Sequence, residues 1–329
     1  MMELGGAEIA GIKMHAAIDV TMRRNHIHHC TMGIWCDWEA QGTRLSQNLL
    51  HDNQRPPFAS VLKGGMMSQD IFVEVGHGPT LIDNNIMLSD ASLRFATEGV
   101  ALVHNLICGA LTCVGGGTGP RYTPYHMPHR TEVMGFMTVL HGDDRFYNNI
   151  FVQKWPSDDI ITMHDSDDGF DTENRAAGTW MFDEYPTYDE WISQFDFSKP
   201  ADMAKLYGAH EGKLPVWIEG NAYLGGAKPS KKDVNALISD VAREDVRVEL
   251  VKKEDGYYLD TNVYELIEGF KNRMIDSDVL GKAFEPEERF ENPDGTAIRF
   301  DSDYFGTHRG VDVIPGPFAG AEEAAKVLY

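Results

Sequence analysis

Two acidic residues lie at matching positions in two similar segments of the chain. Asp37 precedes Asn48 by 11 residues, and Glu74 precedes Asn85 by the same 11 residues. If the segments stack as neighbouring strands, the two carboxyl groups lie about 4.8 Å apart and point to the same face. Such a pair suits a retaining glycosidase, whose carboxyl groups are roughly 5–5.5 Å apart. Aligned acids also arise by chance on surface ladders, so the spacing alone leaves this chemistry a hypothesis.

The elements that must hold this pair are short strand-like segments that recur along the chain, each with an asparagine inside it. An apolar residue precedes each asparagine by three positions, and the shortest spacings between asparagines, 20 and 23 residues, fit one coil of a solenoid. We therefore predict an all-β fold, a right-handed parallel β-helix in which equivalent residues stack; an ordinary β-sandwich is the alternative. The asparagines are Asn25, Asn48, Asn85, Asn105, Asn149 and Asn221, and the apolar residues are Met22, Leu45, Ile82, Leu102, Phe146 and Ile218.

The sequence divides into a predicted catalytic core, residues 1–228, and a C-terminal extension, residues 229–329, that caps or packs on the β-helix. Long insertions interrupt the core, and solenoid loops on one side commonly build a binding face. In the extension we expect an amphipathic helix, then a hairpin turning at residues 254–256, then a strand. The insertions are Asn53–Gln69, Gly115–Arg130 and Pro156–Pro215; the expected elements are Ser230–Glu244, Arg247–Asp260 and Thr296–Phe300.

Charge and composition narrow the classes of partner. The formal net charge of −22 opposes binding to nucleic acid, to anionic membranes and to polyuronates, and it favours a neutral substrate such as a neutral oligosaccharide. A soluble acidic surface without any such role explains the charge equally well. The four cysteines form no CxxC pair and are expected to be buried free thiols. Neither a signal peptide nor a membrane span is visible, which favours a cytoplasmic location. The sequence leaves a homo-oligomer open.

Four stretches of the chain resemble glycoside hydrolase family 120, the β-xylosidases. They are EIAGIKMHAAIDV near the start, GIWCDWEAQGTR around Asp37, DIFVEVGHGP around Glu74, and RYTPYHMPHR at residues 121–130. In that family the aspartate of the second string is the nucleophile and the glutamate of the third is the general acid/base, which assigns these roles to Asp37 and Glu74. The resemblance implies an exo-acting, retaining β-xylosidase of xylan degradation that needs no cofactor.

Family members are longer at the N-terminus than this sequence. They begin with further β-helix coils and carry an inserted β-sandwich domain. The resemblance therefore implies that the chain is the C-terminal portion of a longer protein, and that alone it is poorly soluble or less active. Two other functions stay open: a non-catalytic carbohydrate-binding β-helix and, third, a polysaccharide lyase, which would use a Lys or Arg base and usually calcium.

Residues beside the pair are further candidates. Trp35 and Trp38 flank Asp37, and strand alternation is taken to turn both away from it, which favours core packing over a sugar platform. The coil alignment places Met14 and Arg94 in the same column as the two acids. At that position Arg94 could keep a neighbouring carboxylate ionised, although packing of its apolar stem explains it equally well.

Other candidates come from the family-like strings. Glu8 could bind sugar hydroxyls and His77 could line a pocket, but a surface carboxylate and a turn histidine are equally plausible. The Pro-braced loop at 121–130 carries aromatic and imidazole groups, which suit the faces and hydroxyls of a sugar. The candidate substrate-binding residues are Glu8, Trp38, His77, Arg94, Tyr122, Tyr125, His126 and His129.

No metal or cofactor site is predicted. His26, His28 and His29 are closely spaced, but no Cys or carboxylate completes a familiar ligand set, so a solvated turn is expected. The glycine-rich stretch 115–119 lacks the following Lys-Ser/Thr and helix of a phosphate loop. The acidic stretch 165–171 does not match the spacing of a calcium loop.

Overall fold

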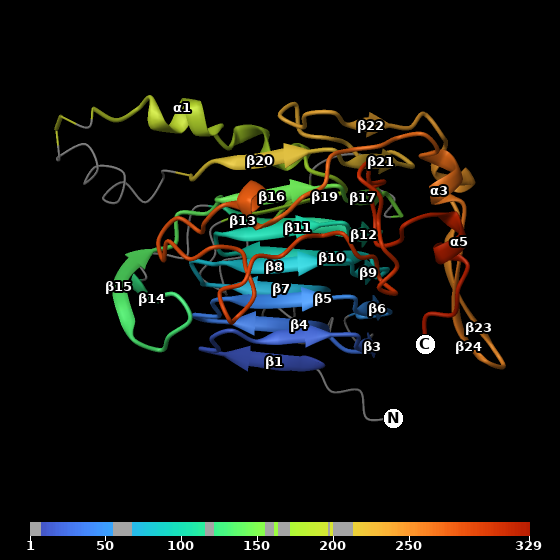
Figure 1. Cartoon of the computed structure of the whole chain (residues 1–329), viewed down its shortest axis with the longest axis horizontal. Helices are drawn as coiled ribbons and strands as arrows, with labels where there is room; N and C mark the ends of the chain where they lie inside the picture. The colour runs from blue at the N-terminus through green and yellow to red at the C-terminus, as the bar shows by residue number, and fades with distance from the viewer. Residues whose placement is uncertain are drawn as a thin grey trace.

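The computed structural model describes residues 8–54, 68–115, 122–154, 161–163, 172–196, 198–199 and 213–329. The chain is mostly β. Each coil contributes one strand to each of three mainly parallel sheets, an arrangement consistent with a β-helix (Figure 1). The first sheet contains β1 (Ile12–His15), β4 (Met32–Asp37), β7 (Gln69–Glu74), β10 (Ala91–Ala96) and β13 (Ala110–Gly115), followed by antiparallel β19 (Thr172–Ala176) and β18 (Ile161–Met163).

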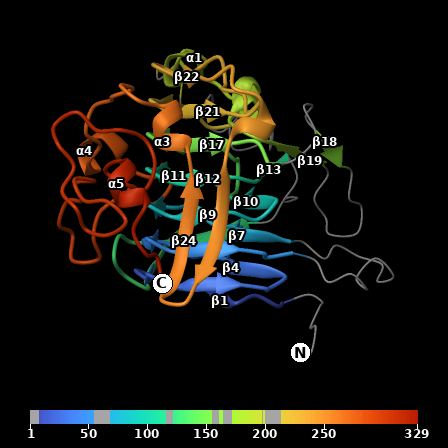
Figure 2. The ribbon, with the colours of Figure 1, turned by 90° about the vertical axis from the view of Figure 1, so that its right-hand side faces the viewer.

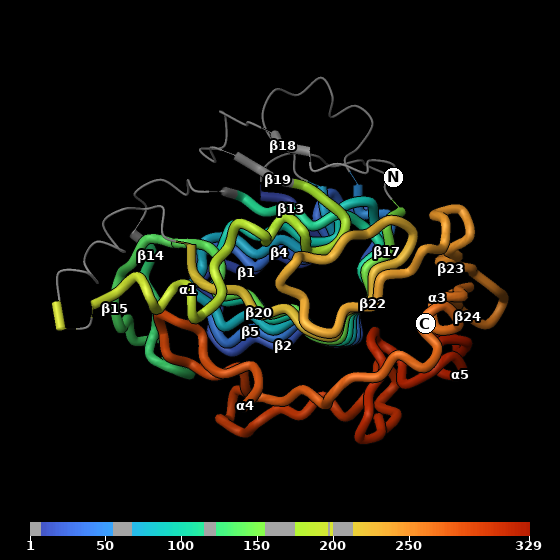
Figure 3. Tube along the Cα trace, turned by 90° about the horizontal axis from the view of Figure 1, so that it is seen from above, coloured from blue at the N-terminus to red at the C-terminus, as the bar shows by residue number. Residues whose placement is uncertain are grey.

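The other two sheets repeat the same order. The second contains β2 (Thr21–Arg23), β5 (Thr43–Ser46), β8 (Thr80–Asp83), β11 (Val100–Val103), β16 (Asp144–Tyr147) and β20 (Val216–Glu219). The third contains β3 (His26–His28), β6 (Leu49–His51), β9 (Ile86–Met87), β12 (Leu106–Ile107), β17 (Ile150–Val152), β21 (Ala222–Leu224) and β22 (Leu237–Ile238). Viewed from above, the coils superpose around a common interior (Figure 3). That interior is apolar, and its buried side chains include Ile34, Leu45, Leu50, Ile71 and Ile82.

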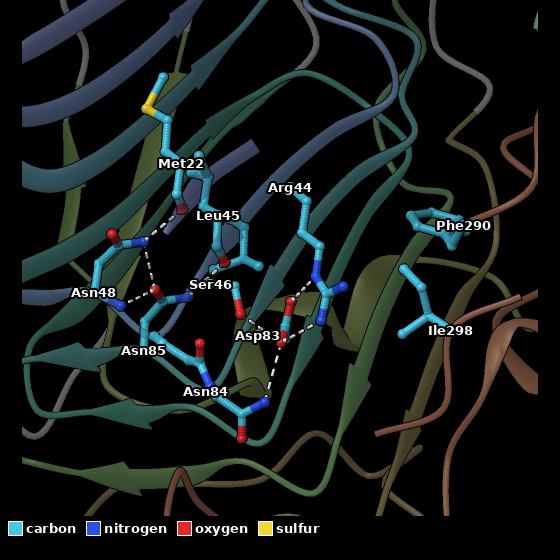
Figure 4. A network of polar contacts seen from close by, with 12 residues as sticks. Met22, Arg44, Leu45, Ser46, Asn48, Asp83, Asn84, Asn85, Phe290 and Ile298 are labelled. Atoms are coloured by element: carbon cyan, nitrogen blue, oxygen red, sulfur yellow. Dashed lines mark hydrogen bonds and ion pairs between the residues drawn. The ribbon is translucent and has the colours of Figure 1, made fainter. Parts of the chain in front are cut away.

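The predicted asparagine stack is confirmed from Asn25 to Asn221, and Figure 4 shows the bonds between Asn48 and Asn85. Asn85 Oδ1 accepts both the backbone N–H and the side-chain amide of Asn48, each at 2.9 Å. Asn85 in turn donates to Leu45 O at 2.9 Å and to Asn105 Oδ1 at 3.0 Å. The same bonds link Asn25 to Asn48 and continue through Asn149 to Asn221. Each central side chain therefore uses both its donors and its acceptor inside the protein, where water cannot replace them.

The C-terminal extension covers the outer faces of the second and third sheets. It contains the hairpin β23 (Val248–Lys253) and β24 (Gly256–Thr261), which lies alongside the third sheet (Figures 1 and 2). Its helices are short: η3 (Arg243–Asp245), α3 (Val263–Leu266), α4 (Ser277–Leu280) and α5 (Ala321–Ala324). Outward apolar side chains of the second sheet, such as Leu81 and Val103, pack under Phe290 and Ile298. Those of the third sheet, such as Ile150, pack under residues of the hairpin and the last helix.

The expected elements of the extension hold only in part. The hairpin is confirmed, with its turn between β23 and β24. The expected helix at Ser230–Glu244 is wrong: the segment forms turns, the short strand β22 and the beginning of η3. A helix does not form here because β22 pairs with β21 at the end of the third sheet. This pairing provides hydrogen-bond partners for the backbone groups of β21. The stretch Thr296–Phe300 forms isolated bridges and no regular strand.

The insertion Asn53–Gln69 lies mainly outside the described residues, as do the glycine-rich and acidic stretches. The insertion Gly115–Arg130 contains β14 (Tyr122–His126), which pairs with β15 (Val133–Thr138) in a hairpin where a long loop was expected. Within the last insertion, η2 (Trp180–Glu184) and α1 (Tyr188–Ile192) are described. Cys36, Cys108 and Cys113 are buried free thiols as predicted, whereas Cys30 is only half-buried. Among the described residues, no helix is both long and apolar enough to cross a membrane.

The ladder gives a stability prediction with an internal control. Replacing Asn105 with Ala leaves the amide groups of Asn85 and the carbonyl of Ile82 without their partner. Because each orphaned buried group costs about 1–3 kcal/mol, we expect a destabilisation of about 3 kcal/mol or more. Asn25→Ala, in the first described coil, should cost less than about 1 kcal/mol, because the side chain of Asn25 makes a single, partly exposed bond there. Denaturant midpoints measure both, and equal effects would contradict the proposed role of the ladder.

Candidate active site

Asp37 and Glu74 end neighbouring strands of the first sheet and point out of the coil. In β4 and β7 alternate residues face opposite sides, so Ile34, Cys36 and Val73 enter the core while both acids face outward. Cys36 pairs with Val73, so the next register position brings the two acids together. The C-terminal extension packs on the outer faces of the second and third sheets. The carboxyl pair lies on the outer face of the first sheet.

The chain turns directly after each acid. Val75, next to Glu74, has φ 44, and Glu39 has φ 67; the Glu39 amide donates to the Val75 carbonyl at 3.1 Å. A β-branched residue in the left-handed region is a strained choice that the surrounding structure must enforce. The turns therefore end both strands at the same level and hold the two carboxyl groups at the corner of the sheet.

The two carboxyl groups have different surroundings. Glu74 is largely buried, and this burial, together with the charge of Asp37, raises its pKa to about 7. The Trp35 indole N–H donates to Glu74 Oε2 at 2.9 Å and opposes the rise, as does the charge of Arg94. Asp37 instead faces a cation: Lys13 Nζ lies 2.8 Å from its Oδ2. Glu74 is thus poised to hold a proton near neutral pH, and Asp37 has an ammonium group as its partner.

Three residues that complete this arrangement were missed or misplaced by sequence reasoning. Trp35 was expected to face away from Asp37, but the two residues are two apart in one strand and so share a face. Lys13 lies over the Trp35 ring at 3.7 Å and also pairs with Glu8. His15 is the true neighbour of Asp37 in the preceding coil, with its Nε2 4.0 Å from Oδ2.

The expected column of Met14 and Arg94 is wrong. Met14 pairs with Cys36 and packs against the core. Arg94 pairs with Phe72, and its guanidinium lies 4.9 Å from that ring, fully buried. The coils before and after the pair differ in the number of residues between the first sheet and the asparagine, so counting back from the asparagine finds the wrong residue. It works for Asp37 and Glu74 because that number is the same in their two coils.

The β14–β15 hairpin docks beside the pair through its own polar groups. Gln41 bonds both the N–H and the C=O of His126, at 2.9 and 3.0 Å. The rings of His126 and His129 contact carboxylates, with Glu39 at 3.4 Å and Asp19 at 3.0 Å respectively. The hairpin histidines therefore anchor the hairpin to the turns that follow the strands. The side chain of Tyr122 lies outside what the structure describes.

His77 and Tyr125 belong to a second, buried network under the hairpin. His77 bonds Glu98 at 2.5 Å and the carbonyl of Thr123 at 3.1 Å, so both ring nitrogens are engaged by the protein. The Tyr125 ring packs edge-on against His77 at 5.6 Å. Burial and the charge of Glu98 raise the pKa of Glu285, in the C-terminal extension, to about 8. This network joins the turn that follows Glu74, through His77, to strand β14 of the hairpin.

Two candidates remain at the rim. Glu8 is mostly exposed and contacts Lys13, which joins it to Asp37 through one ammonium group. Trp38 packs edge-on against His15 at 5.3 Å, and its indole nitrogen is buried without a hydrogen-bond partner in the described structure.

The described fold and site define a class: a mostly β protein of stacked parallel sheets with a carboxyl pair at one sheet corner. A solved structure, XylC in complex with xylose, is similar to this chain, with a TM-score of 0.77 and 34% sequence identity. The match covers 95% of this chain and 43% of XylC, so the chain spans less than half of XylC's length. No family model matches the chain. No curated protein matches it either.

The electrostatic asymmetry of the pair can be tested without substrate. Asp37→Asn removes the nearby negative charge, so the pKa of Glu74 should fall below its value of about 7 while burial keeps it above that of a free glutamate. Because Trp35 bonds Glu74, tryptophan fluorescence recorded against pH should report the titration. Glu74→Gln supplies the baseline, since it removes the titrating group. An unchanged midpoint in Asp37→Asn would show that the two carboxyl groups do not interact.

Proposed function

We propose that the chain belongs to a retaining glycoside hydrolase that acts on β-xylosides, in the manner of the glycoside hydrolase family 120 that its sequence resembles. The observation that carries the proposal is the juxtaposition of Asp37 and Glu74 at one register position on adjacent strands, with the pKa of Glu74 raised to about 7. The likeness to XylC, whose structure contains xylose, supports a neutral pentose substrate. We further propose that the coils form a right-handed β-helix and that the chain is the C-terminal portion of the enzyme.

Asp37 would act as the nucleophile and Glu74 as the general acid/base. Asp37 attacks the anomeric carbon while Glu74 gives its proton to the leaving oxygen, and a glycosyl ester forms on Asp37. Glu74, now a carboxylate, takes a proton from the water that hydrolyses the ester. Strand spacing of about 4.8 Å leaves no room for the water that inversion needs between acid and sugar, which is why direct attack is favoured.

The surrounding residues support these roles. Lys13 offsets the charge of Asp37 in the free site, and its contact with Glu8 gives the ammonium a second partner when the glycosyl ester forms. The Trp35 indole stabilises the ionised form of Glu74, the form required in the second step. We propose that Glu8 and Trp38, at the rim of the site, lie close to the bound sugar. Arg94 is fully buried and acts through its charge on Glu74.

Turnover of an aryl β-xyloside by the full gene product tests the mechanism. Asp37→Ala should lose nearly all activity, and Glu74→Ala should lose about 10²–10⁴-fold on substrates whose leaving group needs a proton. Glu74→Ala should lose less with an activated leaving group, and azide should restore rate as the glycosyl azide. Proton NMR of the first product should show retained configuration. Glu249→Gln, an exposed acid of the distant hairpin, controls for net charge and should behave as wild type.

An inverted first product would contradict Asp37 as the nucleophile. A second function, carbohydrate binding without catalysis, predicts a different pattern. Xylo-oligosaccharides would then bind equally well to wild type and to Asp37→Ala, with no turnover by either.

The pH profile provides a separate test of Glu74. Because Glu74 must be protonated in the first step, kcat/KM should fall as pH rises through its pKa of about 7. Trp35→Phe removes a hydrogen bond that favours the carboxylate, so it should raise the pKa of Glu74 and move the alkaline limb to higher pH. Activity well below the limb should be largely kept. A limb that moves to lower pH would assign it to another group.

A further inference from the structure

Three imidazole groups converge on the outer face of the third sheet, away from the carboxyl pair. His26 and His28 are two apart in β3 and so share a face, while Ile27 between them enters the core. His51 ends β6 in the next coil, where it pairs with His28. The His28 and His51 rings stack at 4.9 Å, with 13° between their planes. One ring nitrogen from each histidine lies within 4.8 Å of the others.

The hydrogen bonds around His51 fix which nitrogen is available. Its Nδ1 lies 2.6 Å from Asp52 Oδ2, so Nδ1 carries the proton that Asp52 accepts, and Nε2 keeps a lone pair. That Nε2 lies 2.7 Å from Nε2 of His26. Two ring nitrogens at this separation share one proton, and a metal ion can take the place of that proton when His26 adopts its other tautomer. A carboxylate behind a ligating histidine is the usual second partner in metal sites.

The donor set selects the class of ion. Neutral imidazoles bind Zn²⁺, Ni²⁺ and Cu²⁺, whereas Ca²⁺ and Mg²⁺ require oxygen ligands. With metal–nitrogen bonds of about 2.0–2.1 Å, tetrahedral ligands lie roughly 3.3 Å apart, so His26 and His51 need to separate only slightly. The His28 ring, stacked nearly parallel on His51, must turn so that its lone pair points at the same ion. Three histidines leave the fourth position to water.

A second cluster makes a useful comparison. Asp19, His129 and Glu288 also place ligand atoms within 4.8 Å of one another. There, however, both nitrogens of His129 already bond carboxylates, Asp19 at 3.0 Å and Glu291 at 3.4 Å. That imidazole serves as the cation of its cluster. In the cluster on the third sheet, Nε2 of His26 faces Nε2 of His51, and no carboxylate lies between them. Nδ1 of His28 lies 2.6 Å from Nδ1 of the exposed His29, which leaves Nε2 of His28 for the ion.

We propose that His26, His28 and His51 form a binding site for one zinc-like transition-metal ion. The site joins the first two coils, and the C-terminal extension closes over it: the rings of Tyr257 and Tyr329 lie 4.8 and 5.0 Å from His26. A bound ion therefore links the first coils and stabilises the region where the chain's last residue returns to them. It lies on a different sheet from Asp37 and Glu74, so it takes no part in turnover.

Zinc titration of the EDTA-treated full gene product tests the site. We expect one Zn²⁺ per chain by isothermal titration calorimetry, a rise in the thermal unfolding midpoint with zinc, and tetrahedral Co²⁺ absorption when cobalt replaces it. His28→Ala and His51→Gln should each weaken binding at least about 100-fold, and Asp52→Asn by about 10- to 100-fold. His308→Ala removes an exposed histidine outside the cluster and should bind as wild type.

Circular dichroism of each variant without metal establishes that it is folded. Folded cluster variants that bind zinc as tightly as wild type would overturn the proposal, as would wild-type binding no tighter than millimolar. Xyloside turnover should be the same with and without zinc. Loss of turnover in Asp37→Ala concerns the proposed function alone, so either proposal can fail without the other.

Discussion

The asparagine ladder is the interaction on which the rest of the structure depends. A solenoid coil has no tertiary contacts except with its neighbours, so its register must be fixed within each coil. An apolar interior cannot do this alone, because a slip by two residues keeps the same side chains inside. The amide of Asn85 cannot slip without leaving buried donors and an acceptor unpaired, and the same holds for Asn105. The ladder thus gives coils of unequal length a common reference position, from which the register of each coil is set.

That common reference position explains both the success and the failure of the sequence predictions. The asparagine spacing and the apolar residues before it could be read directly, because the ladder repeats without exception from Asn25 to Asn221. The positions of Asp37 and Glu74 followed because their coils have equal lengths between first sheet and ladder. Arg94 was misplaced because its coil does not, and no residue type marks where the difference is absorbed. Counting back from the asparagine therefore finds the equivalent residue only in coils where the same number of residues separates the first sheet from the ladder.

Other features were within reach of the sequence or beyond it for identifiable reasons. Trp35 could have been placed with Asp37 by applying strand alternation correctly, and His51 could have been found opposite His28, since each follows its asparagine by three residues. The docking of Gln41 on His126 could not, because the two lie 85 residues apart and nothing local records the contact. The helix expected at Ser230–Glu244 does not form, because β22 pairs with β21 at the end of the third sheet, and charge periodicity alone does not predict such tertiary pairing.

The candidate site depends on a difference between two like groups. A parallel ladder places similar environments side by side, which would give both acids similar surroundings. The asymmetry comes from the coils on either side: Lys13, the register partner of Trp35, reaches Asp37 from the preceding coil, whereas Ala96, the register partner of Glu74 in the following coil, is uncharged. Glu74 is therefore buried between a carboxylate and an apolar neighbour, and its proton is retained to about pH 7. The repeating scaffold brings the two acids together, and the side chains of Lys13 and Ala96 in the adjoining coils give them different surroundings.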